Sequence, residues 1–148
     1  MAKVALGCDH AGFHLKEFIK KHLEERRYNI VDHGCFDTES TDYPDYAVKV
    51  AHTVAEDPKN RGILVCGTGI GMSIAANKVR GIRAALCHNE FEAQMCREHN
   101  DANIVCLGAR VLKMQRQLAI RIVEKFLRTE FEGGRHQRRV EKIAAIEA

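Results

Sequence analysis

Residues 63–73 read Ile-Leu-Val-Cys-Gly-Thr-Gly-Ile-Gly-Met-Ser, a short apolar run that passes directly into a loop with three glycines. The run shows no alternation of polar and apolar residues, which is typical of a strand covered on both faces of a parallel sheet. Three glycines between such a strand and a helix bring several backbone N–H groups to face one point, where they can bind an anion. A tight turn without a ligand is the alternative explanation.

Four more apolar runs of the same type occur along the chain, with amphipathic segments of helical periodicity between them. The predicted strands are 4–6, 28–31, 63–66, 83–87 and 103–107. The predicted helices cover 15–23, 45–56, a segment from about 71, 90–97 and 111–128. Strands and helices that alternate in this order predict an α/β sandwich with right-handed crossovers. No linker or repeat divides residues 1–148, so we expect one domain.

The first helix and the last part of the chain carry two further expectations. On the helix through 15–23, Leu15 and Ile19 lie on the apolar face, and Lys16 is expected on the polar face. Gly133-Gly134 is expected to end the helix of 111–128, and a short amphipathic helix should follow. A terminal helix of this size needs a surface to pack against, either its own sheet or a second subunit.

The composition excludes several classes of protein. The chain has 23 Lys and Arg against 20 Asp and Glu, and a net charge of +3 is too small to indicate a nucleic-acid partner. No apolar run approaches the roughly 18–20 residues of a membrane helix, and none resembles a secretory signal. The six cysteines form no C-x-x-C pair, so a zinc ribbon or a thioredoxin-type motif is not expected. We therefore expect a cytoplasmic domain without a membrane partner.

Cys66 is the candidate reactive residue of the glycine loop. A cysteine beside backbone amides at the start of a helix is in an environment that favours its thiolate. The alternative is a buried core cysteine, which fits Cys8 and Cys106 better than it fits Cys66. The loop is not a dinucleotide-binding fingerprint, because Met72 stands where the third glycine would be required.

Further candidates follow from the rule that ligands bind at the carboxyl ends of parallel strands. Applied to this chain, the rule groups Asp9 and His10 with the glycine loop and with His99-Asn100-Asp101 near the fifth strand. Each of these residues also has an ordinary explanation, such as a hydrogen-bonded surface histidine or an aspartate that caps a turn.

Arg135 and Arg139 are four residues apart, so a helix would present both guanidinium groups to one side. Paired arginines suit a phosphate dianion, because each can bond two oxygens. A solvated basic face or a nonspecific nucleic-acid patch is the alternative.

Together, eight motifs in order along essentially the whole chain resemble the ribose-5-phosphate isomerase B family, which includes allose-6-phosphate and galactose-6-phosphate isomerases. The resemblance implies a Rossmann-like three-layer α/β/α sandwich with five parallel strands in the order 2-1-3-5-4. The motifs are 7–12 (GCDHAG), 41–44 (TDYP), 66–71 (CGTGIG), 75–78 (AANK), 81–84 (GIRA), 99–101 (HND), 108–110 (GAR) and 132–136 (EGGRH).

The resemblance also implies a reaction, the isomerisation of ribose 5-phosphate to ribulose 5-phosphate through a cis-enediolate. It implies that Cys66 is the base for the C2 proton and that His99 opens the furanose ring. It implies no metal and no cofactor. The residues implied to contact the sugar, the enediolate oxygen or the phosphate are Asp9, His10, Tyr43, Gly67, Thr68, Gly69, Ile70, Gly71, Asn100, Arg110, Arg135 and Arg139.

The family resemblance leaves two alternatives open. A six-carbon substrate, allose 6-phosphate or galactose 6-phosphate, is the runner-up, although galactose-specific members pair unlike subunits of which one lacks the cysteine. A sugar-phosphate sensor could dispense with Cys66 and His99, so the presence of both favours an enzyme. Some members carry a glutamate where this chain has Met72, so this chain is expected to use the cysteine.

The resemblance further implies a homodimer, possibly paired into a tetramer, with its sites at the subunit interface. We therefore expect the tail of about 133–148 to dock at that interface, and either this tail or the segment His99–Arg110 to cross to the neighbouring subunit. The expected ligand is a small sugar phosphate.

Overall fold

A single parallel sheet of five strands, in the order β2-β1-β3-β5-β4, forms the centre of the computed structural model, which describes residues 1–113 and 115–147. Every residue of β1 and β5 is buried, as expected for strands covered on both faces. The predicted strand order and the parallel α/β architecture are confirmed. The strands are β1 (Val4–Cys8), β2 (Ile30–Asp32), β3 (Arg61–Cys66), β4 (Ala84–Leu86) and β5 (Ile104–Gly108).

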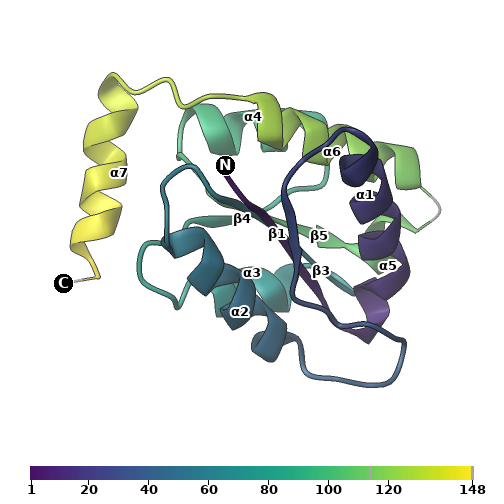
Figure 1. The fold of residues 1–148 in the computed structure, drawn as a ribbon. Helices are drawn as coiled ribbons and strands as arrows, with labels where there is room; N and C mark the ends of the chain where they lie inside the picture. Colours follow the sequence, from purple (N-terminus) through teal and green to yellow (C-terminus); the bar gives the residue numbers. More distant parts are fainter. Residues whose placement is uncertain (114, 148) are drawn as a thin grey trace.

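Helices cover both faces of this sheet, with α1, α4 and α6 on one side and α2 and α3 on the other (Figure 1). The sheet therefore has a hydrophobic core on each face, and alternate residues of β3 pack into one or the other. Ile63 and Val65 face the first group of helices, and Leu64 and Cys66 face the second. The helices are η1 (His10–Gly12), α1 (Phe13–Glu25), α2 (Tyr43–Ala55), α3 (Ile70–Ala76), α4 (Glu90–Glu98), α5 (Ala109–Leu112), α6 (Arg116–Arg128) and α7 (Arg135–Ala145).

The helix predicted over 111–128 ends at Arg128 as expected, but it is not continuous. It is divided into α5 and α6, because Lys113 adopts a positive φ of 49° that no α-helix contains; residue 114 of the predicted helix lies outside the described residues. The expectation that Gly133-Gly134 ends this helix is wrong, because α6 ends at Arg128, before the two glycines. Thr129 has extended backbone, and its hydroxyl donates to the carbonyl of Lys125 at 2.6 Å.

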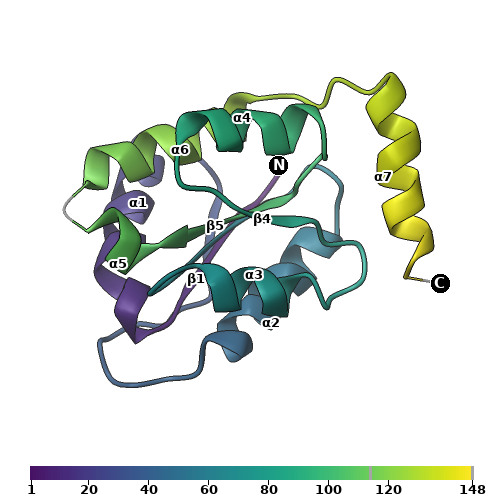
Figure 2. The same ribbon diagram turned by 180° about the vertical axis from the view of Figure 1, so that it is seen from behind.

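The C-terminal helix α7 stands apart from the sheet in both views (Figures 1 and 2). Its first turns bury His136 and Val140, but Ile143 is 43% and Ile146 82% exposed. At its end, Glu147 accepts a hydrogen bond from the backbone N–H of Gly81 at 2.9 Å. The helix thus forms where the sequence predicts it, but its own sheet does not cover its apolar face. None of the helices in the described ranges is long and apolar enough to span a bilayer.

A buried ion pair joins α1 to β2, and it corrects the expectation for Lys16. The Lys16 side chain is fully buried, and its ammonium donates to both carboxylate oxygens of Asp32, at 3.0 and 2.8 Å. It also donates to the carbonyl of Cys35 at 3.0 Å. Burial acts to raise the pKa of Asp32, but the hydrogen bonds from Lys16, the Gly34 amide and Lys20 outweigh it and lower that pKa. Lys16 therefore belongs to the core, because Asp32 lies within its reach.

Replacing Lys16 by Met should lower the free energy of unfolding by about 3 kcal/mol, because it removes a hydrogen-bonded partner from the buried Asp32. Lys20→Met is the matched control and should cost about 1 kcal/mol or less, since the Lys20 side chain is 28% exposed. Urea denaturation at neutral pH measures both. The difference from wild type should shrink as the pH falls through the lowered pKa of Asp32. Equal urea midpoints for the two variants would contradict the role given to Lys16.

Candidate active site

A cavity of about 400 Å³ opens at the edge of the sheet where the strands end, called the carboxyl edge below. Strands β1, β3 and β5 end there together, with Cys8 paired to Val65 and Cys66 paired to Gly108. The rule that placed the site at this edge therefore locates a real hollow. The cavity is lined by Asp9, Tyr43, Cys66, Gly67, Thr68, Ile70, Gly71, Ile74 and Arg110.

The glycine loop after β3 contacts the Cys66 side chain. The backbone N–H of Gly69 donates to the Cys66 sulfur at 3.1 Å. Gly69 has a φ of 78°, and a Cβ atom there would lie 2.9 Å from the backbone carbon of Leu107, so only glycine fits. The carbonyl of Gly67 accepts a hydrogen bond from the Arg110 backbone N–H at 2.9 Å. The loop is thus fixed against β5 and α5, and it covers Cys66, a residue that is only 5% exposed.

The loop after β1 forms the second wall. Asp9 accepts hydrogen bonds from the backbone N–H groups of Ala11 and Gly12, at 3.0 and 3.1 Å, and so caps η1. His10 accepts a hydrogen bond at Nδ1 from the backbone N–H of Thr41 at 3.2 Å. Thr41 lies two residues before Tyr43, the first residue of α2. The same short segment therefore fixes the His10 ring and leads to Tyr43.

His99, Asn100 and Asp101 do not lie at this edge, and the expectation that their own chain gathers them beside Cys66 is wrong. His99 caps the C-terminus of α4, and the three residues precede β5, which begins at Ile104. Because the strands are parallel, a segment that precedes a strand lies at the opposite edge, called the amino edge below. Asp101 has a structural role there, in ion pairs with Arg97 at 2.9 Å and Arg83 at 3.4 Å.

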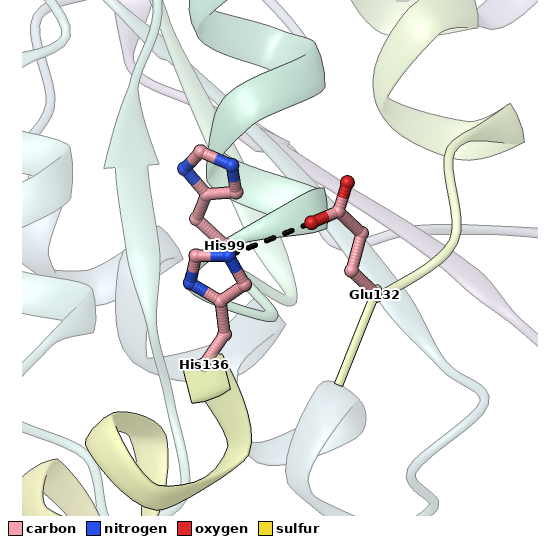
Figure 3. A group of neighbouring side chains, drawn as sticks. All are labelled: His99, Glu132 and His136. Atoms are coloured by element: carbon pink, nitrogen blue, oxygen red, sulfur yellow. Dashed lines mark ion pairs between the residues drawn. The ribbon is translucent and has the colours of Figure 1, made fainter. Parts of the chain in front are cut away.

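A second group of predicted residues gathers at the amino edge around His99. Its ring stacks on that of His136, with centroids 4.2 Å apart and 11° between the ring planes (Figure 3). Because His136 opens α7, this contact brings the helix with the exposed Arg135 and Arg139 next to His99 and Asn100. Burial, together with nearby His99 and Arg135, lowers the pKa of His136. One chain therefore divides the predicted site residues between two edges of its sheet.

Comparison with known proteins identifies the family and the fold. A family model described as ribose/galactose isomerase matches residues 4–143. The chain belongs to this isomerase family. It is 52% identical over 147 residues to ribose-5-phosphate isomerase B of Escherichia coli, covering 99% of this chain and 97% of that protein. It is 51% identical over 146 residues to a putative sugar phosphate isomerase of Bacillus subtilis, covering 98% and 97%.

Solved structures of ribose/galactose isomerases have the same fold. Ribose-5-phosphate isomerase B of Clostridium thermocellum superposes with a TM-score of 0.93 at 52% identity, covering 98% of this chain and 97% of that one. The Mycoplasma genitalium enzyme, solved with bound ribulose 5-phosphate, also gives 0.93, at 43% identity and with coverage of 98% and 95%.

Sequence reasoning missed three residues of this isomerase fold that lie beside candidate site residues. Ile74 lines the cavity from the second turn of α3, and its position four residues after Ile70 on a predicted helix was the available signal. Glu132 and His136 belong to the 132–136 motif, but only Arg135 of that motif received a role. Their proximity to His99 depends on the path of the chain after α6, which has no local signal.

Gly69→Ala should lower the free energy of unfolding by about 1–3 kcal/mol, because its φ is positive and its Cβ would collide with the Leu107 backbone. Gly81→Ala is the matched control. Gly81 has a similar φ of 86°, but no atom lies within 4 Å of a Cβ placed there. Urea denaturation should rank Gly69→Ala as clearly the less stable variant. A Gly81→Ala chain that is equally destabilised would show that backbone strain alone, and not packing on β5, is responsible.

Proposed function

We propose that this chain interconverts ribose 5-phosphate and ribulose 5-phosphate by moving a proton between C1 and C2 through a cis-enediolate. The observation that carries the proposal is the Cys66 sulfur, held at a sugar-sized cavity by the Gly69 amide at 3.1 Å. It is supported by a relative named ribose-5-phosphate isomerase B at 52% identity and by a relative solved with bound ribulose 5-phosphate.

In this proposal Cys66, as a thiolate, takes the proton from C2 of the open-chain aldose and returns it to C1. Negative charge then develops on the oxygens of C1 and C2. The backbone N–H groups of the Gly67–Gly71 loop, of which that of Gly69 donates to the sulfur, would donate to that charge without moving as it develops. The proton on one enediol oxygen passes to the other, so the sugar is isomerised with no net gain or loss of protons.

The proposed sugar contacts are Asp9, Tyr43 and Thr68, which line the cavity, together with His10. The Arg110 side chain lies over the glycine loop, with a guanidinium nitrogen 3.1 Å from the place a Gly67 Cβ would take. Arg110 and His10 are therefore the groups of the same chain that would bind the phosphate.

The rest of the proposed site comes from a second copy of the chain. His99, Asn100, Arg135 and Arg139 lie at the amino edge, away from the Cys66 of their own chain. In a dimer with two-fold symmetry each subunit would insert these residues into the cavity of the other. There His99 would open the furanose with Asn100 beside it, and the arginines would complete the phosphate site.

Exposed apolar side chains supply the surface that such a dimer would bury. Tyr43, Ile70 and Ile74 are 39%, 51% and 60% exposed around the cavity, and the apolar side of α7 carries Ile143 and Ile146. We infer a homodimer that buries these surfaces, and such dimers can pair into tetramers. The six free cysteines fit the reducing environment of the cytoplasm.

Cys66→Ala should lower kcat by about 10²–10⁴-fold, the usual contribution of a positioned general base, while the chain stays folded. A coupled assay of ribose 5-phosphate conversion measures the loss. Cys106→Ala is the control, since Cys106 lies on the neighbouring strand β5 but is fully buried and does not line the cavity. Its kcat per folded chain should stay close to that of the wild type. A Cys66→Ala chain that keeps more than about a tenth of wild-type kcat would remove Cys66 from the role of base.

His99→Asn should impair conversion of ribose 5-phosphate more than exchange of the C1 proton of ribulose 5-phosphate. The aldose must first open a furanose ring, a step for which an imidazole, which can donate and accept a proton, is suited. Ribulose 5-phosphate forms no such ring, because its C5 oxygen carries the phosphate. Solvent-proton exchange followed by NMR gives the second rate. Equal losses in both reactions would contradict a ring-opening role.

A further inference from the structure

His136 is a buried imidazole whose Nε2 has no hydrogen-bond partner among the described residues. The residue is only 5% exposed, and the carboxylate oxygen Oε1 of Glu132 lies 3.5 Å from the same nitrogen. A buried polar atom without a partner is uncommon in a folded protein, because no hydrogen bond offsets the free-energy cost of removing it from water. A ligand bound beside this nitrogen would supply the partner that it lacks.

Three donor groups converge on that place, from His99, Glu132 and His136 (Figure 3). Each offers one ligand atom, and the three atoms all lie within 4.8 Å of one another. The backbone holds them there: the Glu132 N–H donates to the carbonyl of Glu98 at 3.1 Å, and the His99 N–H donates to that of Met95 at 2.9 Å. Two imidazoles and a carboxylate form a ligand set typical of Zn²⁺ and related transition-metal ions.

We propose that His99, Glu132 and His136 bind one transition-metal cation of the Zn²⁺ type, with water as the fourth ligand, and that this ion inhibits the enzyme. The ion takes no part in the isomerisation. Tetrahedral Zn²⁺ with bonds of about 2.0–2.1 Å places its ligand atoms about 3.3 Å apart, so the cluster must contract on binding. One of the two nearly parallel rings must also turn to aim its nitrogen at the ion. The Glu132 side chain, 52% exposed, can follow.

The inhibition rests on the proposed function, because it depends on the role of His99 in ring opening. A ring nitrogen coordinated to a metal cannot exchange a proton with the sugar. The positive charges of Arg135 and Arg139 near the cluster weaken the binding of a cation, and the Glu132 carboxylate opposes them. Bound sugar phosphate should therefore compete with the ion for His99.

Isothermal titration of Zn²⁺ into the metal-free, full-length Cys66→Ala chain tests the site without activity and without the Cys66 thiol as a rival ligand. We expect one ion per chain. Glu132→Gln and His136→Gln should each weaken binding at least tenfold, an effect of the order seen for groups that support a metal site. Glu130→Gln is the matched control, an exposed glutamate two residues away, and should bind as the parent does. The absence of binding, or binding that neither variant weakens, would overturn the proposal.

The effect of the ion on activity is measured with chains that retain Cys66. Zn²⁺ should inhibit the wild type, EDTA should restore it, and Mg²⁺, which prefers oxygen ligands, should have no effect. Glu132→Gln should keep its activity and escape inhibition, whereas Glu130→Gln should be inhibited like the wild type. Zn²⁺ binding without inhibition would support the metal site but overturn the inhibitory role. A fully active Cys66→Ala chain would overturn the proposed function and leave the binding result to stand by itself.

Discussion

The direction of the strands is the constraint on which the proposed active site depends. In a parallel sheet all strands end at one edge, so a loop after a strand and a segment before a strand lie at opposite sides of the molecule. Cys66 follows β3, and His99 precedes β5. A single chain cannot bring the two together without unfolding an element of its sheet. The same residues can meet only between two copies, and this is why the catalytic proposal requires a dimer.

The carboxyl edge is built by close approaches of backbone to backbone. A Cβ at Gly12 would lie 2.4 Å from the carbonyl oxygen of Val65, and one at Gly108 would lie 2.6 Å from that of Thr68. These contacts draw the loops after β1, β3 and β5 into one wall around Cys66. Packing of this kind leaves little freedom for the amides that face the cavity, which suits groups proposed to stabilise a developing negative charge.

Much of the fold could be predicted from the sequence because its signals are local. Buried apolar runs such as Ile63–Cys66 and a glycine loop directly after a strand have a periodicity and a composition that specify their own structure. Lys16 could not be placed, because a lysine on a helix reads as exposed unless the position of Asp32 is known. The break at Lys113 also has no signal in the sequence, since lysine is a good helix former.

For the candidate site, the chemistry and the place of the Cys66 cavity could be predicted, but the position of His99 could not. The resemblance of its eight motifs to the ribose-5-phosphate isomerase B family indicated an isomerase, and the strand-end rule located the Cys66 cavity. The rule does not extend to His99, because it concerns the loops that follow a strand and His99 precedes β5. The partnership of His99 with His136 is a tertiary contact between α4 and α7, and neither helix carries a signal for it.

Complementation between two inactive variants tests the two-chain site most directly. Cys66→Ala and His99→Asn chains, co-refolded in equal amounts, should form mixed dimers in half of the cases. In each mixed dimer one site combines both substitutions and the other has neither. The mixture should therefore recover about a quarter of wild-type activity on ribose 5-phosphate. A mixture no more active than its separate components, with mixed dimers shown by native mass spectrometry, would contradict a site shared between subunits.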